Sequence, residues 1–169
     1  MKVKIKLDAD WEIDAEIPDE VAEKLKKKEI KRTGYERVDN GKTYYYELYD
    51  GTIDTDTEAN AESDTECYET GNYYSDRNIA INNARATVLM RKLRRFAAEH
   101  RVETINNSTD QWYEIYYDYE FKQIRIEYVS DCKFFGVIQF DSTEAAQLAI
   151  DTFRDELIWY FTKYKDSIE

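Results

Sequence analysis

The chain has 169 residues and a formal net charge of −12, from 24 Lys plus Arg against 36 Asp plus Glu. This length is enough to bury a core, and a hydrophobic content of 42% argues against a disordered chain. The charge disfavours nucleic acid and anionic membranes as direct partners and suits a partner that is itself basic. No stretch approaches the roughly 18 apolar residues of a membrane span, so the sequence predicts a cytoplasmic protein.

Residues 1–33 are predicted to form a ββα segment. Apolar residues alternate with lysines over residues 3–7 and with acids over residues 11–17, which is typical of two half-buried strands joined by a turn. Residues 19–28 follow Pro18 and carry acids at their start and lysines at their end. The helix dipole favours that arrangement, so we expect a short helix there.

Residues 34–103 are predicted to form a hairpin followed by a long helix. The tyrosine-rich stretch at 43–49 has high strand propensity and runs into an Asp-Gly turn. Residues 71–74 are expected to close the sheet segment. Ser75 or Asp76 is then expected to cap a helix with a periodic apolar face.

Residues 104–169 repeat this plan. Three strands are predicted, at 112–117, 124–128 and 136–140. Residues 141–144 carry capping chemistry for one long helix, and at least two of four of its large side chains are expected in the core: Phe153, Leu157, Trp159 and Phe161. Tyr74 and Phe140, which precede the two helices, are 66 positions apart. The sequence predicts an α+β fold: antiparallel sheet segments with packed helices, two similar hairpin-plus-helix units after a ββα segment.

The usual constellations of catalysis do not occur in the sequence. His100 is the only histidine, and the two cysteines, Cys67 and Cys132, do not form a CxxC pair. No phosphate-binding glycine loop occurs, and zinc would need a Cys and His cluster that the sequence lacks. We therefore expect no catalytic residues, no metal and no cofactor, and a protein that acts by binding.

An acidic stretch between residues 50 and 69, which contains no Lys or Arg, is the most informative feature. Its candidate partner-binding acids are Asp54, Asp56, Glu58, Glu62, Asp64 and Glu66. In an extended chain, acids two residues apart stand on one face at about 6.6–6.8 Å, the scale of successive phosphates along a nucleic-acid strand. This spacing favours a nucleic-acid mimic, and a solvated acidic loop is the plain alternative. Tyr68, Tyr73 and Tyr74 are the candidate aromatic anchors.

The first long helix has the opposite charge. Arg91, Arg94 and Arg95 are predicted to share one side of it, at i, i+3 and i+4 spacing. Alone, such a basic face would suggest phosphate contacts. Beside so many acids, a salt-bridge network within the chain or between subunits is the favoured interpretation, which leaves a homodimer open.

Four segments resemble small accessory proteins of phages and prophages of Gram-positive bacteria. They are Tyr-Tyr-Tyr at 44–46, Gly-Asn-Tyr-Tyr-Ser at 71–75, Arg-Arg-Phe-Ala at 94–97 and, above all, Asp-Glu-Leu-Ile-Trp-Tyr-Phe-Thr-Lys-Tyr at 155–164. The resemblance covers roughly residues 34–166. It implies a phage accessory protein, a class that includes inhibitors of host defence and acidic inhibitors of CRISPR nucleases.

The leading hypothesis is therefore an anti-defence binding protein in the cytoplasm of the infected host. In its most specific form it is an anti-CRISPR that docks on the basic nucleic-acid-binding surface of a Cas nuclease through the acidic stretch. A phage structural or assembly protein is the second hypothesis. A module that sequesters a nucleotide signal, with the basic helix contacting the phosphates, is the third.

Among metal sites, the acidic stretch most resembles a calcium-binding loop. The EF-hand loop needs Gly at its sixth position and Glu at its twelfth, and counting from Asp54 these positions hold Ala59 and Thr65. We therefore predict that a metal chelator such as EDTA leaves the melting temperature unchanged. A fall of many degrees in a thermal unfolding scan would show that a bound metal ion stabilises the fold.

Overall fold

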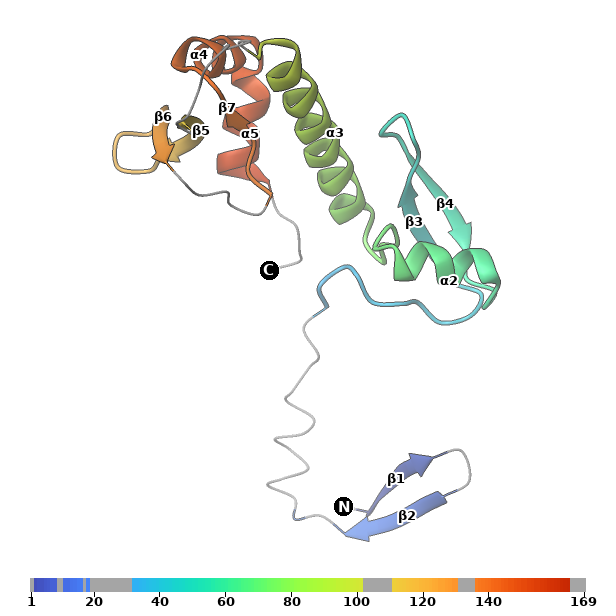
Figure 1. The fold of residues 1–169 in the computed structure, drawn as a ribbon. Coiled ribbons are helices and arrows are strands. Elements are labelled where there is room, and N and C mark those ends of the chain that lie inside the picture. Colours follow the sequence, from blue (N-terminus) through green and yellow to red (C-terminus); the bar gives the residue numbers. More distant parts are fainter. Residues whose placement is uncertain are drawn as a thin grey trace. The chain divides into compact units, whose positions relative to one another are not determined.

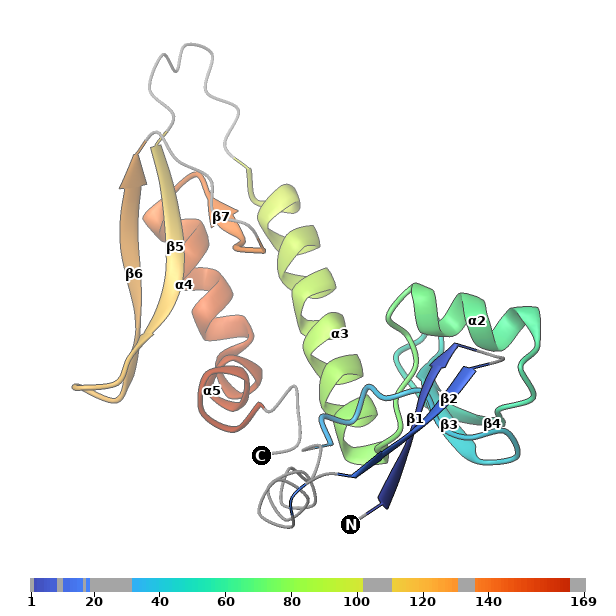
Figure 2. The ribbon, with the colours of Figure 1, turned by 90° about the horizontal axis from the view of Figure 1, so that it is seen from below.

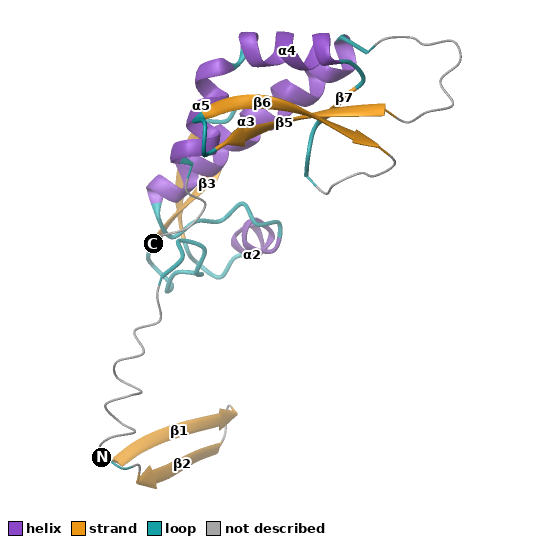
Figure 3. Ribbon diagram, turned by 90° about the vertical axis from the view of Figure 1, so that its left-hand side faces the viewer, coloured by secondary structure: helices purple, strands orange, loops and turns teal. Residues whose placement is uncertain are grey.

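The computed structural model describes residues 2–8, 11–16, 18, 32–101, 111–130 and 136–164. The chain separates into two compact units, Met1–Thr33 and Gly34–Glu169. The described residues form a mixed α+β structure with two two-stranded sheets and one three-stranded sheet, all antiparallel (Figure 3). Within these ranges, no helix combines the length and the apolar character that crossing a bilayer requires.

The first unit contains an antiparallel hairpin of β1 (Lys2–Asp8) and β2 (Trp11–Glu16) (Figure 1). The register places Ile5 opposite Ile13. Both predicted strands are confirmed. The helix that the sequence predicts at 19–28 lies outside the described residues.

The second unit begins with a hairpin of β3 (Thr43–Glu47) and β4 (Ile53–Thr57). The connecting turn depends on Gly51, whose φ of +87° is strained for any residue with a side chain. A Cβ atom at Gly51 would also lie 2.5 Å from Cγ2 of Val88. The turn therefore needs glycine both for its conformation and for its close approach to the helix that carries Val88.

After β4 the chain forms α2 (Glu62–Glu69) and then α3 (Arg77–Glu99). Asp76 caps α3, because its Oδ1 accepts hydrogen bonds from the amides of Asn78 at 2.8 Å and Ile79 at 3.1 Å. The long helix and one of its two predicted caps are confirmed.

The second half of this unit repeats the plan with β5 (Gln111–Asp118), β6 (Gln123–Ser130), β7 (Gln139–Phe140), α4 (Thr143–Thr152) and α5 (Arg154–Lys163). The strand order is β6-β5-β7. The strand predicted at 136–140 is thus confined to its last two residues. Ser142 caps α4, since its hydroxyl accepts a hydrogen bond from the amide of Ala145 at 3.1 Å.

The prediction of one long helix in this region is wrong. The helix is interrupted at Phe153, which separates α4 from α5. Phe153 leaves the helical conformation, with φ −116° and ψ 23°, and its ring packs edge-on against Phe96 at 5.6 Å. The break also places Asp155 and Glu156 in the first turn of α5, where the helix dipole favours carboxylates.

The internal repeat is visible in the pairing of the central strands. In each half, the first strand of the hairpin also pairs along its other edge with a second segment. The paired residue of that segment lies two positions before the N-cap of the following helix. These pairs are Tyr45 with Tyr74 and Tyr113 with Phe140. Ala80 and Ala146, also 66 positions apart, both lie fully buried in the helices that follow. The two halves therefore share one topology, as the spacing predicts.

Two hydrophobic clusters share α3. Near its start, Ile79 and Ala80 pack with Tyr74, and further along Leu89 and Leu93 join the larger cluster. The helix accordingly contacts β3 and β4 with one part and α4 with another (Figure 2). The predicted division of residues 34–169 at position 103 therefore crosses a shared core.

We predict that Leu157→Ala destabilises the protein by about 2–5 kcal/mol, because Leu157 is buried in the larger cluster and its removal leaves a cavity. Ile158 is its neighbour on α5 but is 39% exposed. Ile158→Ala is the matched control and should cost about 1 kcal/mol or less. Urea unfolding of both variants measures the difference. Equal costs would show that the Leu157 face of α5 is not core.

Candidate functional site: an acidic surface over a buried polar network

The acidic stretch contains both a strand and a helix. Asp54 and Asp56 lie on β4, whereas Glu62 and Glu66 lie on α2. The extended conformation that sets a phosphate-like spacing therefore applies to the strand part alone. The helix forms because the carboxylate of Asp64, in its first turn, accepts hydrogen bonds from backbone amides that would otherwise lack partners.

Glu58 lies inside the structure, with 1% of its surface exposed. Its carboxylate accepts two hydrogen bonds from Arg37, at 3.0 Å from Nε and 2.9 Å from Nη2. It also accepts one from the Tyr73 hydroxyl at 2.8 Å and one from the Asn60 amide at 2.9 Å. A carboxylate held in this way cannot dock on a partner, so the structure corrects its assignment as a partner-binding residue.

Asp64 is also buried, with 2% of its surface exposed. Its Oδ2 accepts hydrogen bonds from the amides of Ala59 at 2.8 Å and Ala61 at 2.9 Å. Its Oδ1 accepts one from the Tyr44 hydroxyl at 3.0 Å. Asp64 therefore fixes the entry of α2 onto β3, and the structure corrects its predicted role in partner binding as well.

The buried network sets the charge states of its members. Hydrogen bonds from Arg37 hold the pKa of Glu58 below its ordinary value, and those from the Ala59 and Ala61 amides lower the pKa of Asp64. Burial raises the pKa of the Tyr73 phenol to about 12. Both carboxylates are thus ionised at neutral pH while the phenol is neutral and donates a hydrogen bond.

Two of the three predicted aromatic anchors belong to the interior. Tyr73 and Tyr74 are buried, and the Tyr73 ring stacks on Tyr44 with centroids 4.1 Å apart. Tyr68 meets the Tyr73 ring edge-on at 5.5 Å and is 42% exposed. The prediction for Tyr73 and Tyr74 is corrected, because their rings fill the core beside β3, and Tyr68 is the anchor candidate that remains accessible.

Five exposed acids form what we term the acidic surface: Asp54, Asp56, Glu62, Glu66 and Glu69. On α2, the spacing i, i+4, i+7 places the three glutamates on one side, nearly opposite the buried Asp64. On β4, Asp54 and Asp56 share a face with their cross-strand partners Tyr46 and Tyr44.

The strand acids and the helix lie on the same side of the hairpin. Tyr44, the cross-strand partner of Asp56, hydrogen-bonds to Asp64 of α2. The other side of the hairpin faces α3, where Tyr45 and Ile53 pack against the cluster of Tyr74, Ile79 and Ala80. Among the described residues, no Lys or Arg forms an ion pair with any member of the acidic surface.

Arg37 is the residue that reasoning from sequence missed. It lies 21 positions before Glu58 in a segment with no regular structure, and no local pattern connects the two. Its guanidinium also donates to Thr65 at 3.2 Å and lies 5.7 Å from the centre of the Tyr68 ring.

The basic side of α3 is partly neutralised. Arg91 forms an ion pair with Glu47 of β3 at 2.6 Å, and Arg95 pairs with Glu99 of its own helix at 3.7 Å. Arg94 is exposed. The predicted salt-bridge network thus consists here of one contact between elements and one within α3.

No group of three or more His, Cys, Asp or Glu within the described ranges has the arrangement needed to hold a metal ion. No family model matches this sequence, no curated protein is similar to it, and no solved structure matches it. The assignment of function therefore depends on the chemistry of the chain itself.

The lowered pKa values of Glu58 and Asp64 predict acid lability. A carboxylate whose pKa is lower in the folded state stabilises the fold above its ordinary pKa, which is 4.5 for Glu58 and 3.8 for Asp64, and this stability is lost as pH falls through the folded pKa. Glu58→Gln should reduce stability at neutral pH and lose less additional stability than the wild type between about pH 5 and pH 3.

Urea unfolding at a series of pH values measures this difference. Glu62→Gln is the matched control, because Glu62 is exposed on the outer side of α2 and should leave the profile unchanged. Parallel profiles for the wild type and Glu58→Gln would contradict the role of the buried network.

Proposed function

We propose that this protein is a non-catalytic anti-defence inhibitor of phage origin. In this proposal the acidic surface docks on a basic, nucleic-acid-binding surface of a host defence protein, most specifically a Cas nuclease, and excludes the nucleic acid. The observation that carries the proposal is that five carboxylates remain exposed on one side of the β3–β4 hairpin without an ion-pair partner in the described chain.

The division between buried and exposed acids supports a binding role. Glu58 and Asp64 are buried in the interior, and their hydrogen bonds fix the positions of both β4 and α2. The outward acids are therefore attached to elements with defined positions. A preorganised surface loses less conformational entropy on docking than a flexible acidic loop, so this arrangement favours specific recognition over general solubility.

The two kinds of element suit different parts of such a partner. Asp54 and Asp56 follow the two-residue repeat of a strand, so they stand about 6.6–6.8 Å apart, which is on the scale of adjacent phosphates. The glutamates of α2 add a second row of charge beside them. Tyr68, which lies on α2 with the three glutamates, supplies an aromatic side chain that is partly accessible to a partner.

The test is reversal of charge on the strand. We predict that the double variant Asp54→Lys, Asp56→Lys folds normally, because both side chains are exposed, and loses inhibition in a DNA-cleavage assay against a panel of purified Cas nucleases. Where the wild type inhibits, the double variant should be weaker by about 100-fold or more, since each reversal replaces an attraction by a repulsion.

The matched control is Glu120→Lys with Glu127→Lys. These exposed acids lie in the β5–β6 hairpin, and their reversal changes the net charge by the same amount. The control should inhibit at wild-type potency. A folded Asp54, Asp56 variant with undiminished inhibition, or equal loss in both variants, would contradict docking through the acidic surface.

A further inference from the structure

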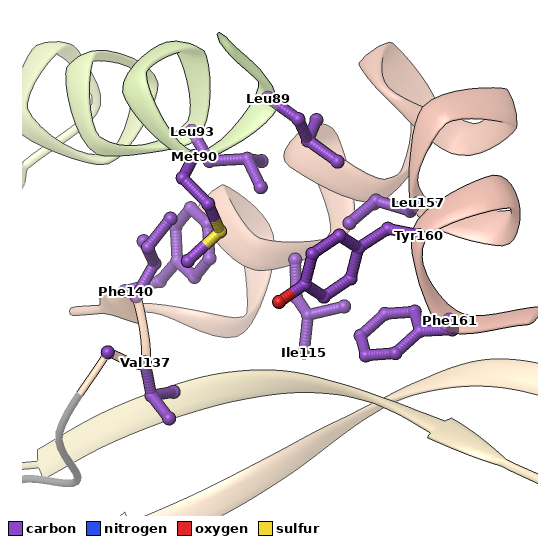
Figure 4. Close-up of a pocket in the computed structure, with 11 residues that line it drawn as sticks. Leu89, Met90, Leu93, Ile115, Val137, Phe140, Leu157, Tyr160 and Phe161 are labelled. Atoms are coloured by element: carbon purple, nitrogen blue, oxygen red, sulfur yellow. The ribbon is translucent and has the colours of Figure 1, made fainter. Parts of the chain in front are cut away.

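A cavity of about 230 Å³, partly open to solvent, lies against the larger hydrophobic cluster. Its walls come from α3, β5, β7 with the residues just before it, and α5 (Figure 4). All 11 residues that line it are uncharged, and all but one lack polar side-chain atoms other than sulfur. No residue of β3, β4 or α2 lines the cavity, so it is separate from the acidic surface.

Concave, mostly apolar spaces with a few polar groups are the usual binding sites of small molecules. An apolar lining offers water almost no hydrogen bonds, so apolar molecules displace water from such a space readily. A cavity of about 150 Å³ holds benzene, so this one has room for a substituted ring.

The lining includes aromatic surface and one polar group. Phe140 and Phe161 present rings to the space, and Met90 adds a polarizable thioether that interacts well with aromatic rings. The hydroxyl of Tyr160 points toward the middle of the cavity and makes no hydrogen bond to the described residues (Figure 4). The site thus combines ring-sized apolar space with one free hydrogen-bonding group.

We propose that this cavity binds a neutral, substituted aromatic compound whose single polar group hydrogen-bonds to Tyr160. Charged ligands do not fit, because no lining residue could neutralise them. This binding is independent of the proposed inhibitory function, so either assignment stands if the other fails.

Two probes of the same shape test the class of ligand. In 4-methylphenol a hydroxyl replaces one methyl group of p-xylene, and both fit a space somewhat larger than benzene requires. We expect each to bind the full-length protein saturably and to shift the methyl NMR signals of Leu89, Leu93 and Ile115. Tyr160→Phe should weaken 4-methylphenol by about 3- to 10-fold, the effect of one lost hydrogen bond, and should leave p-xylene binding unchanged.

A filling variant tests the location. Val137 lies at the rim of the cavity and is 43% exposed, so Val137→Phe can place a ring in the space with little risk to folding. It should weaken both probes at least 10-fold. Leu148→Phe is the matched control, since Leu148 is a similarly exposed apolar residue on α4 outside the cavity. This variant should bind both probes as the wild type does.

Three results would overturn the proposal. Absence of saturable shifts with both probes would mean that the cavity is closed to ligands in solution. Undiminished binding by Val137→Phe would place the ligand elsewhere. Equal sensitivity of both probes to Tyr160→Phe would remove the hydrogen bond that defines the ligand class.

Discussion

A single buried carboxylate, that of Glu58, holds together the part of the molecule on which the acidic surface is built. An unpaired charge in the interior is costly, and a paired one requires nearly every oxygen lone pair to be satisfied. Arg37, Tyr73 and the Asn60 amide meet that requirement. Because these groups come from three separate segments, satisfying Glu58 also joins the segment before β3, the end of β4 and the segment after α2.

This constraint determines which acids face the solvent. Glu58 is turned inward directly after β4, and Asp64 accepts a hydrogen bond from the amide of Ala61 at the start of the helix that follows. The helical period then directs Glu62, Glu66 and Glu69 outward, opposite Asp64. A negatively charged stretch of sequence is thereby converted into an ordered surface with two charges at its base removed from solvent.

The sequence predicted those elements whose signals are local. The capping residues of α3 and α4 and the hairpin β5–β6 follow from short-range patterns, and the structure contains them. The 66-residue repeat follows from comparing two halves of the sequence, and the strand pairing contains it as well. Burial of Glu58 and Asp64 was not predictable, since the burial of a charge depends on partners distant in sequence, such as Arg37. The break at Phe153 was missed because the apolar periodicity continues across it, whereas the ring contact between Phe153 and Phe96, which accompanies the break, joins residues 57 positions apart.

The central claim, that the acidic surface competes with nucleic acid for a basic partner, is tested most directly by displacement. A Cas nuclease that the protein inhibits is loaded with fluorescent DNA, and the protein is titrated in at several salt concentrations while DNA release is followed by anisotropy. The account predicts full competitive displacement, with an inhibition constant that rises steeply as salt increases. A complex that retains both the DNA and the protein, or an inhibition constant that does not change with salt, would contradict it.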